Sequence, residues 1–275
     1  MIDISAKVFE TSKFLKDKFA GQVPEFGIIM GTGLGAFAAE LDIIQSIDYT
    51  EIPHFVQSTV EFHKGKLLLG KLEGKIILIM QGRFHYYEGY SMQEITFPVR
   101  VMKAMNVHQL LLSNAAGGMN PDFKKGDLVL TTDHINLQPD NPLRSLSDPS
   151  LGPRFTDMSC PYSVSLDASL KAAAAETNII LKEGIYVSVM GPNLETRAEY
   201  RWLRSMGADM VGMSTVPEVI VANQVGLPCA AISVITDECD PDNLKPVEIA
   251  EIIAVAGAAD IKLAALWKQL IVSYQ

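Results

Sequence analysis

One short segment concentrates side chains that can bind and polarise a small anion. An apolar run over residues 75–80 is followed within a few positions by Arg83, His85, Tyr87 and Glu88. Arginine offers a planar fork of donors that suits phosphate oxygens, and one histidine nitrogen can donate while a carboxylate orients the other. Because a buried strand delivers these groups to one loop, we expect an anion site at the carboxyl end of a sheet. A surface ion pair between Arg83 and Glu88 is the alternative.

Two turns rich in small residues follow other apolar runs. Residues 31–35 read Gly-Thr-Gly-Leu-Gly, and residues 114–118 read Asn-Ala-Ala-Gly-Gly. In the first, glycines let backbone N–H groups approach an anion, a helix N-terminus behind them adds partial positive charge, and Thr32 adds a hydroxyl donor. In the second, small residues leave the backbone open after a strand over 109–113. Each turn can instead serve close packing alone, and the G-x-G-x-G spacing differs from the dinucleotide fingerprint.

Further candidates lie next to predicted strand and helix ends. Glu195 begins a helix, where it either complements the helix dipole or accepts N–H groups of a ligand. Ser214 either donates to phosphate or caps the next helix. Asp237 follows Thr236 at the end of the last predicted strand, where ligands bind in open α/β sheets. The acidic residues after it lack the calcium-loop register, so we expect no metal site. His63 is a weaker anion contact, or a solvated histidine.

Size and composition limit the class of protein. The chain has 275 residues, is 48% hydrophobic and carries a net charge of -9, which suits one domain over residues 1–275. It has no long basic run and no apolar stretch near the ~20 residues of a membrane span, so we expect neither nucleic-acid nor membrane partners. Its three cysteines are widely spaced and its N-terminus lacks an apolar signal-peptide core, so we expect a cytoplasmic protein.

The hydrophobic periodicity predicts strands that alternate with helices to the end of the chain. This pattern is typical of an α/β domain with a large, mixed, mostly parallel and twisted sheet flanked by helices. Residues 134–162 differ, because prolines and polar groups predominate there. We expect a long surface excursion with a function or a partner of its own. Helices are predicted over 4–20, 91–105, 163–176, 195–206, 217–224 and after 246, and strands over 26–30, 66–72, 75–81, 109–113, 127–131, 185–190, 209–213 and 229–236.

Together these segments resemble the trimeric purine nucleoside phosphorylases, and the related methylthioadenosine phosphorylases share much of the pattern. The matches run in family order across nearly the whole chain, over 31–35, 81–90, 113–118, 134–143, 191–196 and 207–219. The resemblance implies the nucleoside phosphorylase fold and reversible phosphorolysis of purine (deoxy)ribonucleosides of the inosine and guanosine type. It implies inorganic phosphate as co-substrate, no cofactor, and a homotrimer.

The resemblance also implies a role for each matching residue. Phosphate is held by Thr32, His63, Arg83, His85, the backbone of Ala115, and Ser214. The ribose is contacted by Tyr87 and Met213, and the base by Leu194, Glu195, Val211, Thr236 and Asp237. Among these, His85, Glu195 and Asp237 are the implied catalytic residues. Phe155 matches the aromatic residue that such enzymes lend to the sugar pocket of a neighbouring subunit.

Two departures from the family pattern bear on the substrate. Members that act on 6-oxopurines usually carry Asn where this chain has Asp237, and a histidine near the start of the last helix, where residues 246–250 are largely apolar. Both changes favour a methylthioadenosine phosphorylase or a 6-aminopurine enzyme, whereas Glu195 is typical of the 6-oxopurine enzymes. Asp237 can donate to purine N7 only when protonated, and accepts from a 6-amino group when ionised. A nucleosidase that uses water, a dinucleotide-binding oxidoreductase and a non-catalytic nucleotide-binding module are further alternatives.

Overall fold

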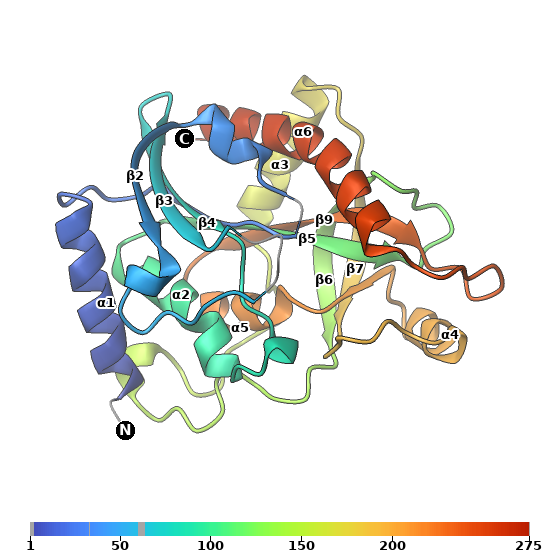
Figure 1. Cartoon of the computed structure of the whole chain (residues 1–275), viewed down its shortest axis with the longest axis horizontal. Coiled ribbons are helices and arrows are strands. Elements are labelled where there is room, and N and C mark those ends of the chain that lie inside the picture. Colours follow the sequence, from blue (N-terminus) through green and yellow to red (C-terminus); the bar gives the residue numbers. More distant parts are fainter. Residues whose placement is uncertain (1–2, 33, 60–63, 275) are drawn as a thin grey trace.

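The computed structural model describes residues 3–32, 34–59 and 64–274, which form helices around one nine-stranded sheet (Figure 1). The helices are α1 (Ile4–Lys18), α2 (Met92–Ala104), α3 (Val164–Glu176), α4 (Arg197–Ser205), α5 (Val216–Gln224) and α6 (Ile249–Ser273). The strands are β1 (Phe26–Ile29), β2 (Asp42–Asp48), β3 (Lys66–Leu72), β4 (Lys75–Gln81), β5 (Gln109–Gly118), β6 (Leu128–Asn136), β7 (Leu181–Ser188), β8 (Met210–Gly212) and β9 (Cys229–Glu238).

The sheet is mixed, as the sequence predicts. The strand order is β2-β3-β4-β1-β5-β8-β7-β6-β9, and an additional pairing joins β5 to β9. With that pairing, the five strands β5, β8, β7, β6 and β9 form a closed ring. The strands β1, β4, β3 and β2 extend the sheet outward from β5. Five of the nine strand pairings are parallel, so the sheet is parallel by a small majority.

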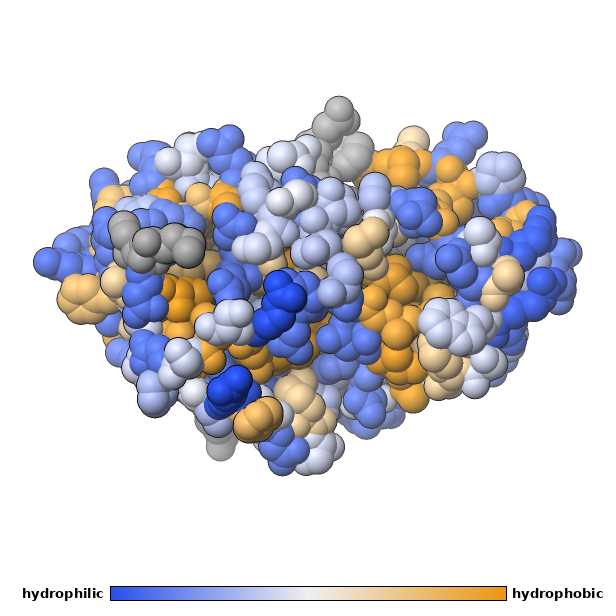
Figure 2. All heavy atoms as spheres, turned by 90° about the horizontal axis from the view of Figure 1, so that it is seen from below, coloured by the Kyte–Doolittle hydropathy of each residue, from blue (hydrophilic) through white to orange (hydrophobic). Residues whose placement is uncertain are grey.

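Helices cover both faces of this sheet (Figure 1). On one face, apolar side chains of α1, α2 and α5 pack on the strands around Ile29 and Leu112. On the other face, α3 and α6 pack on the strands around Ile28 and Leu111. Adjacent strand residues therefore point into two different cores, which is why the central strands are continuous apolar runs. Seen from below, the outer surface mixes hydrophilic and hydrophobic side chains (Figure 2).

The central strand β5 has an edge that is open over a short stretch. Within the described part of the chain, β5 pairs with β1 as far as Leu112 and with β8 only from Gly117, whereas its other edge stays paired with β9. The prediction of an open turn over 114–118 was therefore wrong, because these residues continue the strand. The backbone is nevertheless accessible there, since the neighbouring strand on that side ends before the next one begins.

Besides the longer β5, the observed elements differ from the predicted ones in two places. The strand β2 was not predicted, because most of its residues are exposed and no apolar alternation marks it. The excursion after β6 begins only at residue 137 and is anchored to the body, since Arg100 of α2 donates to the carbonyl of Leu151 and to Gln224. Among the described residues, no helix is long and apolar enough to span a membrane.

Candidate active site

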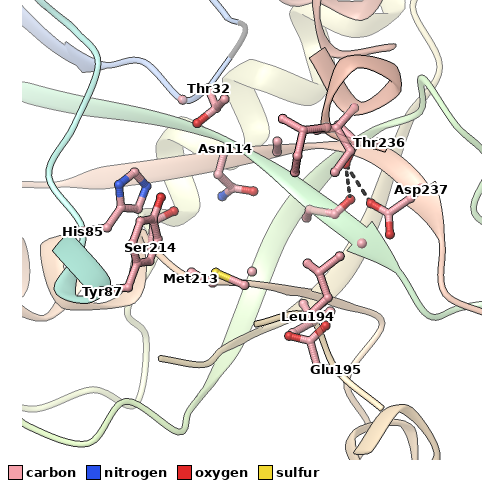
Figure 3. A pocket seen from close by; sticks show the side chains of 18 of the residues that line it. Thr32, His85, Tyr87, Asn114, Leu194, Glu195, Met213, Ser214, Thr236 and Asp237 are labelled. Carbon is pink, nitrogen blue, oxygen red and sulfur yellow. Dashed lines mark hydrogen bonds between the residues drawn. The ribbon is translucent and has the colours of Figure 1, made fainter. Parts of the chain in front are cut away.

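A pocket of about 240 Å³ lies at the open edge of β5. Its lining joins chain segments far apart in sequence, from the turn after β1 to the first turns of α6. Most of the residues predicted from the sequence line it, namely Thr32, Arg83, His85, Tyr87, Ala115, Leu194, Glu195, Val211, Met213, Ser214, Thr236 and Asp237. His85, Tyr87 and Ser214 lie at one end of the pocket, and Glu195, Thr236 and Asp237 lie toward the other, with Met213 between them (Figure 3).

Arg83 is a buried cation whose orientation is fixed. The residue is only 1% exposed, and its Nε donates to Oε1 of Glu218 at 3.0 Å. One of its Nη atoms donates to the carbonyl oxygen of Ser113 at the end of the apolar part of β5. The predicted alternative, a surface pair between Arg83 and Glu88, is wrong, because Glu218 in the first turn of α5 is the partner. A guanidinium held on two sides is preorganised for an anion in the pocket.

His85 is oriented by Glu88, as the sequence predicts. The Nδ1 atom of His85 lies 3.0 Å from Oε1 of Glu88, and the His85 backbone N–H donates to the same oxygen at 2.7 Å. Burial lowers the pKa of His85 more than the Glu88 bond raises it, so the neutral ring predominates at neutral pH. Burial also raises the pKa of Glu88, but hydrogen bonds from His85 and Thr59 lower it to about 2. In the tautomer that donates from Nδ1–H to Glu88, the neutral ring presents Nε2 as an acceptor, and donation from a ring nitrogen to an anion stays a prediction.

The turn before α5 places Ser214 against the anion end of the pocket. Its backbone N–H donates to Oη of Tyr186 at 3.3 Å, and its carbonyl accepts from Ser188 of β7 at 3.1 Å. The helix cap is Thr215, not Ser214, and Thr215 has a φ of 68°, a sparsely populated conformation for this residue type. Such strain persists where the surroundings impose it, and it often marks functional turns. The helix N-terminus beyond it adds partial positive charge to this end.

Asn114 lines the same pocket but was not among the predicted site residues. Its Nδ2 donates to Oγ1 of Thr215 at 2.9 Å, so the amide orientation is fixed. The buried Oδ1 atom has no hydrogen-bond partner among the described residues. An acceptor oriented toward a pocket is suited to a substrate hydroxyl. Asn114 belongs to the 114–118 segment, for which the sequence predicts an accessible backbone but no side-chain contact.

The glycine-rich turn is held by the protein rather than left open for an anion. The N–H groups of Gly35 and Ala36 donate to Oδ2 of Asp260 on α6, and that of Gly31 donates to Oγ of Ser113 at 3.2 Å. Close approach also requires Gly31, because an added Cβ would lie 2.7 Å from Cα of Asn114. The predicted cradle of backbone N–H groups is therefore wrong for these three donors. Thr32 remains in the pocket lining, and the structure does not describe Gly33.

Replacing Asp260 with alanine is expected to lower the free energy of unfolding by about 2 kcal/mol, because two partly buried backbone donors would lose the carboxylate of a buried residue as their acceptor. Urea denaturation of wild type and variant gives this difference. Lys262→Ala is the control, since Lys262 is an exposed residue of the same helix. Equal stability of Asp260→Ala and Lys262→Ala would show that the turn does not depend on this carboxylate.

Glu195 lies at the opposite end of the pocket, immediately before α4. Thr196 caps this helix, since its hydroxyl accepts from the Glu199 N–H at 3.3 Å while the Glu199 carboxylate accepts from the Thr196 N–H at 2.7 Å. This capping box leaves Glu195 outside the helix, with its side chain at the pocket. Burial raises the pKa of Glu195, although a hydrogen bond from Tyr200 lowers it. Tyr200 also lines the pocket and was not predicted.

Asp237 ends β9 beside Glu195, and both of its carboxyl oxygens have partners. Oδ1 lies 2.9 Å from Oγ1 of Thr236 (Figure 3). Oδ2 lies 3.1 Å from Sγ of Cys239. The hydroxyl of Thr236 is also 3.3 Å from the Ala116 carbonyl oxygen. Within the described residues, no group of three or more His, Cys, Asp or Glu side chains is arranged to hold a metal ion.

An apolar wall completes the pocket. Three isoleucines from the first turns of α6 line it, namely Ile249, Ile252 and Ile253. They belong to the largely apolar region that the sequence places at the start of the last helix. The wall offers no hydrogen-bonding side chain to a ligand, so it suits an apolar substituent better than a hydroxyl.

Two predicted site residues are not in this pocket. Phe155 is 89% exposed and lies by a separate surface hollow with Arg154 and Leu143, so it does not reach the pocket of its own chain. The contact of Phe155 with the sugar pocket of a neighbouring subunit stays a prediction. His63 lies outside the described residues.

Comparison with known proteins supports the family and the fold that the sequence predicts. The sequence profile of the Phosphorylase superfamily matches residues 25–272. The chain is 44% identical over 269 residues to purine nucleoside phosphorylase 1 of Bacillus subtilis (strain 168), with 98% of this chain and 99% of that protein covered. It is 50% identical over 228 residues to purine nucleoside phosphorylase 1 of Geobacillus stearothermophilus, with 83% of each covered.

A solved structure extends the likeness to three dimensions. Isoform 2 of purine nucleoside phosphorylase from Schistosoma mansoni, crystallised with cytosine and ribose-1-phosphate, matches with a TM-score of 0.92. The two chains are 37% identical, and the match covers 98% of this chain and 97% of the other. The expected nucleoside phosphorylase fold is thus confirmed.

Proposed function

The chain belongs to the phosphorylase superfamily and, within it, to the purine nucleoside phosphorylases, and on that premise we propose that it is a pentosyltransferase. Its reaction is the reversible phosphorolysis of purine (deoxy)ribonucleosides of the inosine and guanosine type to the free base and (deoxy)ribose 1-phosphate. The observation that carries this proposal is one pocket with a buried, oriented arginine at one end and two carboxylates at the other.

At the anion end, we assign phosphate binding to Thr32, Arg83, His85, the backbone of Ala115, and Ser214. Arg83 supplies the fixed positive charge, since Glu218 and the Ser113 carbonyl hold its orientation. We assign to His85 the tautomer in which Nδ1–H donates to Glu88, so that Nε2 of the neutral ring accepts from a protonated phosphate oxygen. The open edge of β5 supports the assignment to Ala115, and His63 is retained as a prediction.

Between the two ends, Tyr87 and Met213 are assigned to the ribose, and Leu194 and Val211 to the faces of the purine. Phosphate held beside the anomeric carbon offsets the positive charge that develops on the sugar as the glycosidic bond lengthens, and then captures that carbon. Glu195 and Asp237 act on the edges of the departing base, with Thr236 positioning Asp237. The chemistry needs no covalent enzyme intermediate and no cofactor beyond the phosphate co-substrate.

A second candidate substrate class is supported by two features of the site. The three isoleucines of α6 give the pocket an apolar wall, which suits a 5′-methylthio group. Asp237, whose two oxygens both lie within hydrogen-bonding distance of protein donors, suits a 6-amino group. A 5′-methylthioadenosine phosphorylase or a 6-aminopurine nucleoside phosphorylase is therefore the alternative within the family.

Several further properties are part of the proposal. We assign residues 1–275 to one domain and the enzyme to purine salvage in the cytoplasm, which the three free cysteines support. The high exposure of Phe155 supports a homotrimer in which this ring completes the pocket of the next subunit. The partners are then a purine nucleoside and phosphate, without nucleic acid or membrane.

A substrate panel tests the proposed reaction. Inosine, guanosine, adenosine and 5′-methylthioadenosine are each incubated with the purified enzyme, with and without inorganic phosphate, and free base and sugar phosphate are quantified. We expect base release to fall by at least about tenfold when phosphate is omitted, because the buried arginine serves that co-substrate. Base release at the same rate in water alone would indicate a nucleosidase instead.

A further inference from the structure

Behind Asp237 lies a buried thiol that the proposed reaction does not use. The side chain of Cys239 is 1% exposed, and its Sγ lies 3.1 Å from Oδ2 of Asp237. The backbone N–H of Cys239 donates to the Gly118 carbonyl oxygen at 2.7 Å, which fixes the thiol relative to β5. Gly117 makes room for this arrangement, because an added Cβ there would lie 2.6 Å from Sγ and 3.3 Å from Oδ2.

The chemistry of this contact makes the thiol a hydrogen-bond donor. Burial and the neighbouring charge of Asp237 raise the pKa of Cys239 well above its usual range, so the group remains S–H at neutral pH. A carboxylate oxygen can only accept from it. The other oxygen, Oδ1, has the Thr236 hydroxyl at 2.9 Å. The two donors therefore fix the plane of the carboxyl group between them.

We propose that Cys239 is a positioning residue for substrate selection: with Thr236 it holds Asp237 as a hydrogen-bond acceptor and so biases the site toward purines that present an N–H donor, such as a 6-amino group. The inference rests on the proposed phosphorolysis and bears on its second candidate substrate class, the 6-aminopurine nucleosides. A carboxylate oxygen accepts a hydrogen bond from an amino group and is repelled by the carbonyl oxygen of a 6-oxopurine. Cys239 is outside the pocket lining and contacts both Asp237 and Tyr200, and we assign its effect on the purine 6-substituent to the contact with Asp237.

The test compares variants that keep and remove the donor. Cys239→Ala and Cys239→Val remove it, whereas Cys239→Ser retains a hydroxyl donor. We expect the first two to lower the ratio of kcat/KM for adenosine to that for inosine by about fivefold, the effect of one weak hydrogen bond, and Cys239→Ser to stay within twofold of wild type. The change should lie mainly in the KM for nucleoside, with the KM for phosphate unaltered.

Cys229→Ala is the matched control. Cys229 is also a buried thiol of β9, but it lies at the other end of the strand and donates to the Pro161 carbonyl at 3.4 Å. Its replacement should leave the substrate ratio unchanged even where it lowers stability.

Two results would overturn the inference. One is an unchanged ratio in both Cys239→Ala and Cys239→Val. The other is a shift of the same size when Cys239→Val is added to Asp237→Ala, in which there is no carboxyl group to position. A wild type without phosphorolysis would overturn the proposed function instead. In that case the affinities of the same variants for adenine and hypoxanthine, measured by calorimetry, test the role of Cys239 separately. If neither base binds, both the proposed function and the role of Cys239 are wrong.

Discussion

Replacing Arg83 with alanine is expected to raise the KM for phosphate by about 100-fold, while the KM for nucleoside changes less than about threefold. The asymmetry follows from the position of Arg83, which lines the anion end of the pocket and is 1% exposed. A charge-assisted hydrogen bond from a guanidinium contributes about 1.5–3 kcal/mol, and every 1.4 kcal/mol is tenfold, so the loss of one strong bond to phosphate gives an effect of this size. Initial rates over a matrix of phosphate and nucleoside concentrations provide both constants.

The substitution also leaves Glu218 buried without its ion-pair partner, which costs stability. A double variant, Arg83→Ala with Glu218→Gln, removes that unpaired charge and serves as the control for folding. If it regains the thermal stability of wild type but keeps the high KM for phosphate, the effect belongs to phosphate binding. Equal increases in the KM values for phosphate and nucleoside would refute the assignment of Arg83.

Replacing Asp237 with asparagine is expected to raise the ratio of kcat/KM for inosine to that for adenosine by about 100-fold, in the range typical of lost or gained polar contacts to a substrate. The amide keeps the size of the side chain but gains a donor, so it can bind purine N7 and a 6-oxo group. It also loses the negative charge that favours a 6-amino group. Steady-state kinetics on inosine, adenosine and 5′-methylthioadenosine measure the change.

The neighbouring contacts offer a control for this experiment. Asp240 is an exposed acid of the same loop and lies outside the main pocket, so Asp240→Asn should leave the substrate ratio within about twofold of wild type. The assignment of Asp237 is wrong if Asp237→Asn leaves the 6-oxo to 6-amino preference unchanged. A shift of equal size in Asp240→Asn would point to the general charge of the loop instead.

Much of the architecture could be predicted from the sequence, because local signals mark it. The apolar runs of β3 and β4 flank a Glu-Gly turn, and the apolar residues of α6 repeat at helical spacing. The loop with Arg83 and His85 was predictable for the same reason, since it directly follows a buried strand. β2 gave no such signal, because it is an exposed edge strand.

The parts of the site that were not predicted depend on contacts between distant segments. Asp260 lies 225 positions from the Gly35 N–H group that it accepts from, and no local pattern joins them. Asn114 and Tyr200 line one pocket although they come from β5 and α4, which are far apart in the sequence. Cys239 acts through the room that Gly117 leaves on another strand. Spacing along the chain could suggest which groups share an edge of the sheet, but not which partner each one takes.

The last helix has a consequence for the order in which this protein becomes competent. α6 provides both the isoleucine wall of the pocket and the Asp260 carboxylate that holds the turn after β1. A chain that stops before residue 249 would already contain Arg83, Ser214 and Asp237. It would lack the isoleucines that line the pocket and the carboxylate that accepts from the turn after β1. The pocket is therefore complete only when α6 has docked on segments that precede it in the chain, and a chain with α6 undocked lacks both the apolar wall and the anchored turn.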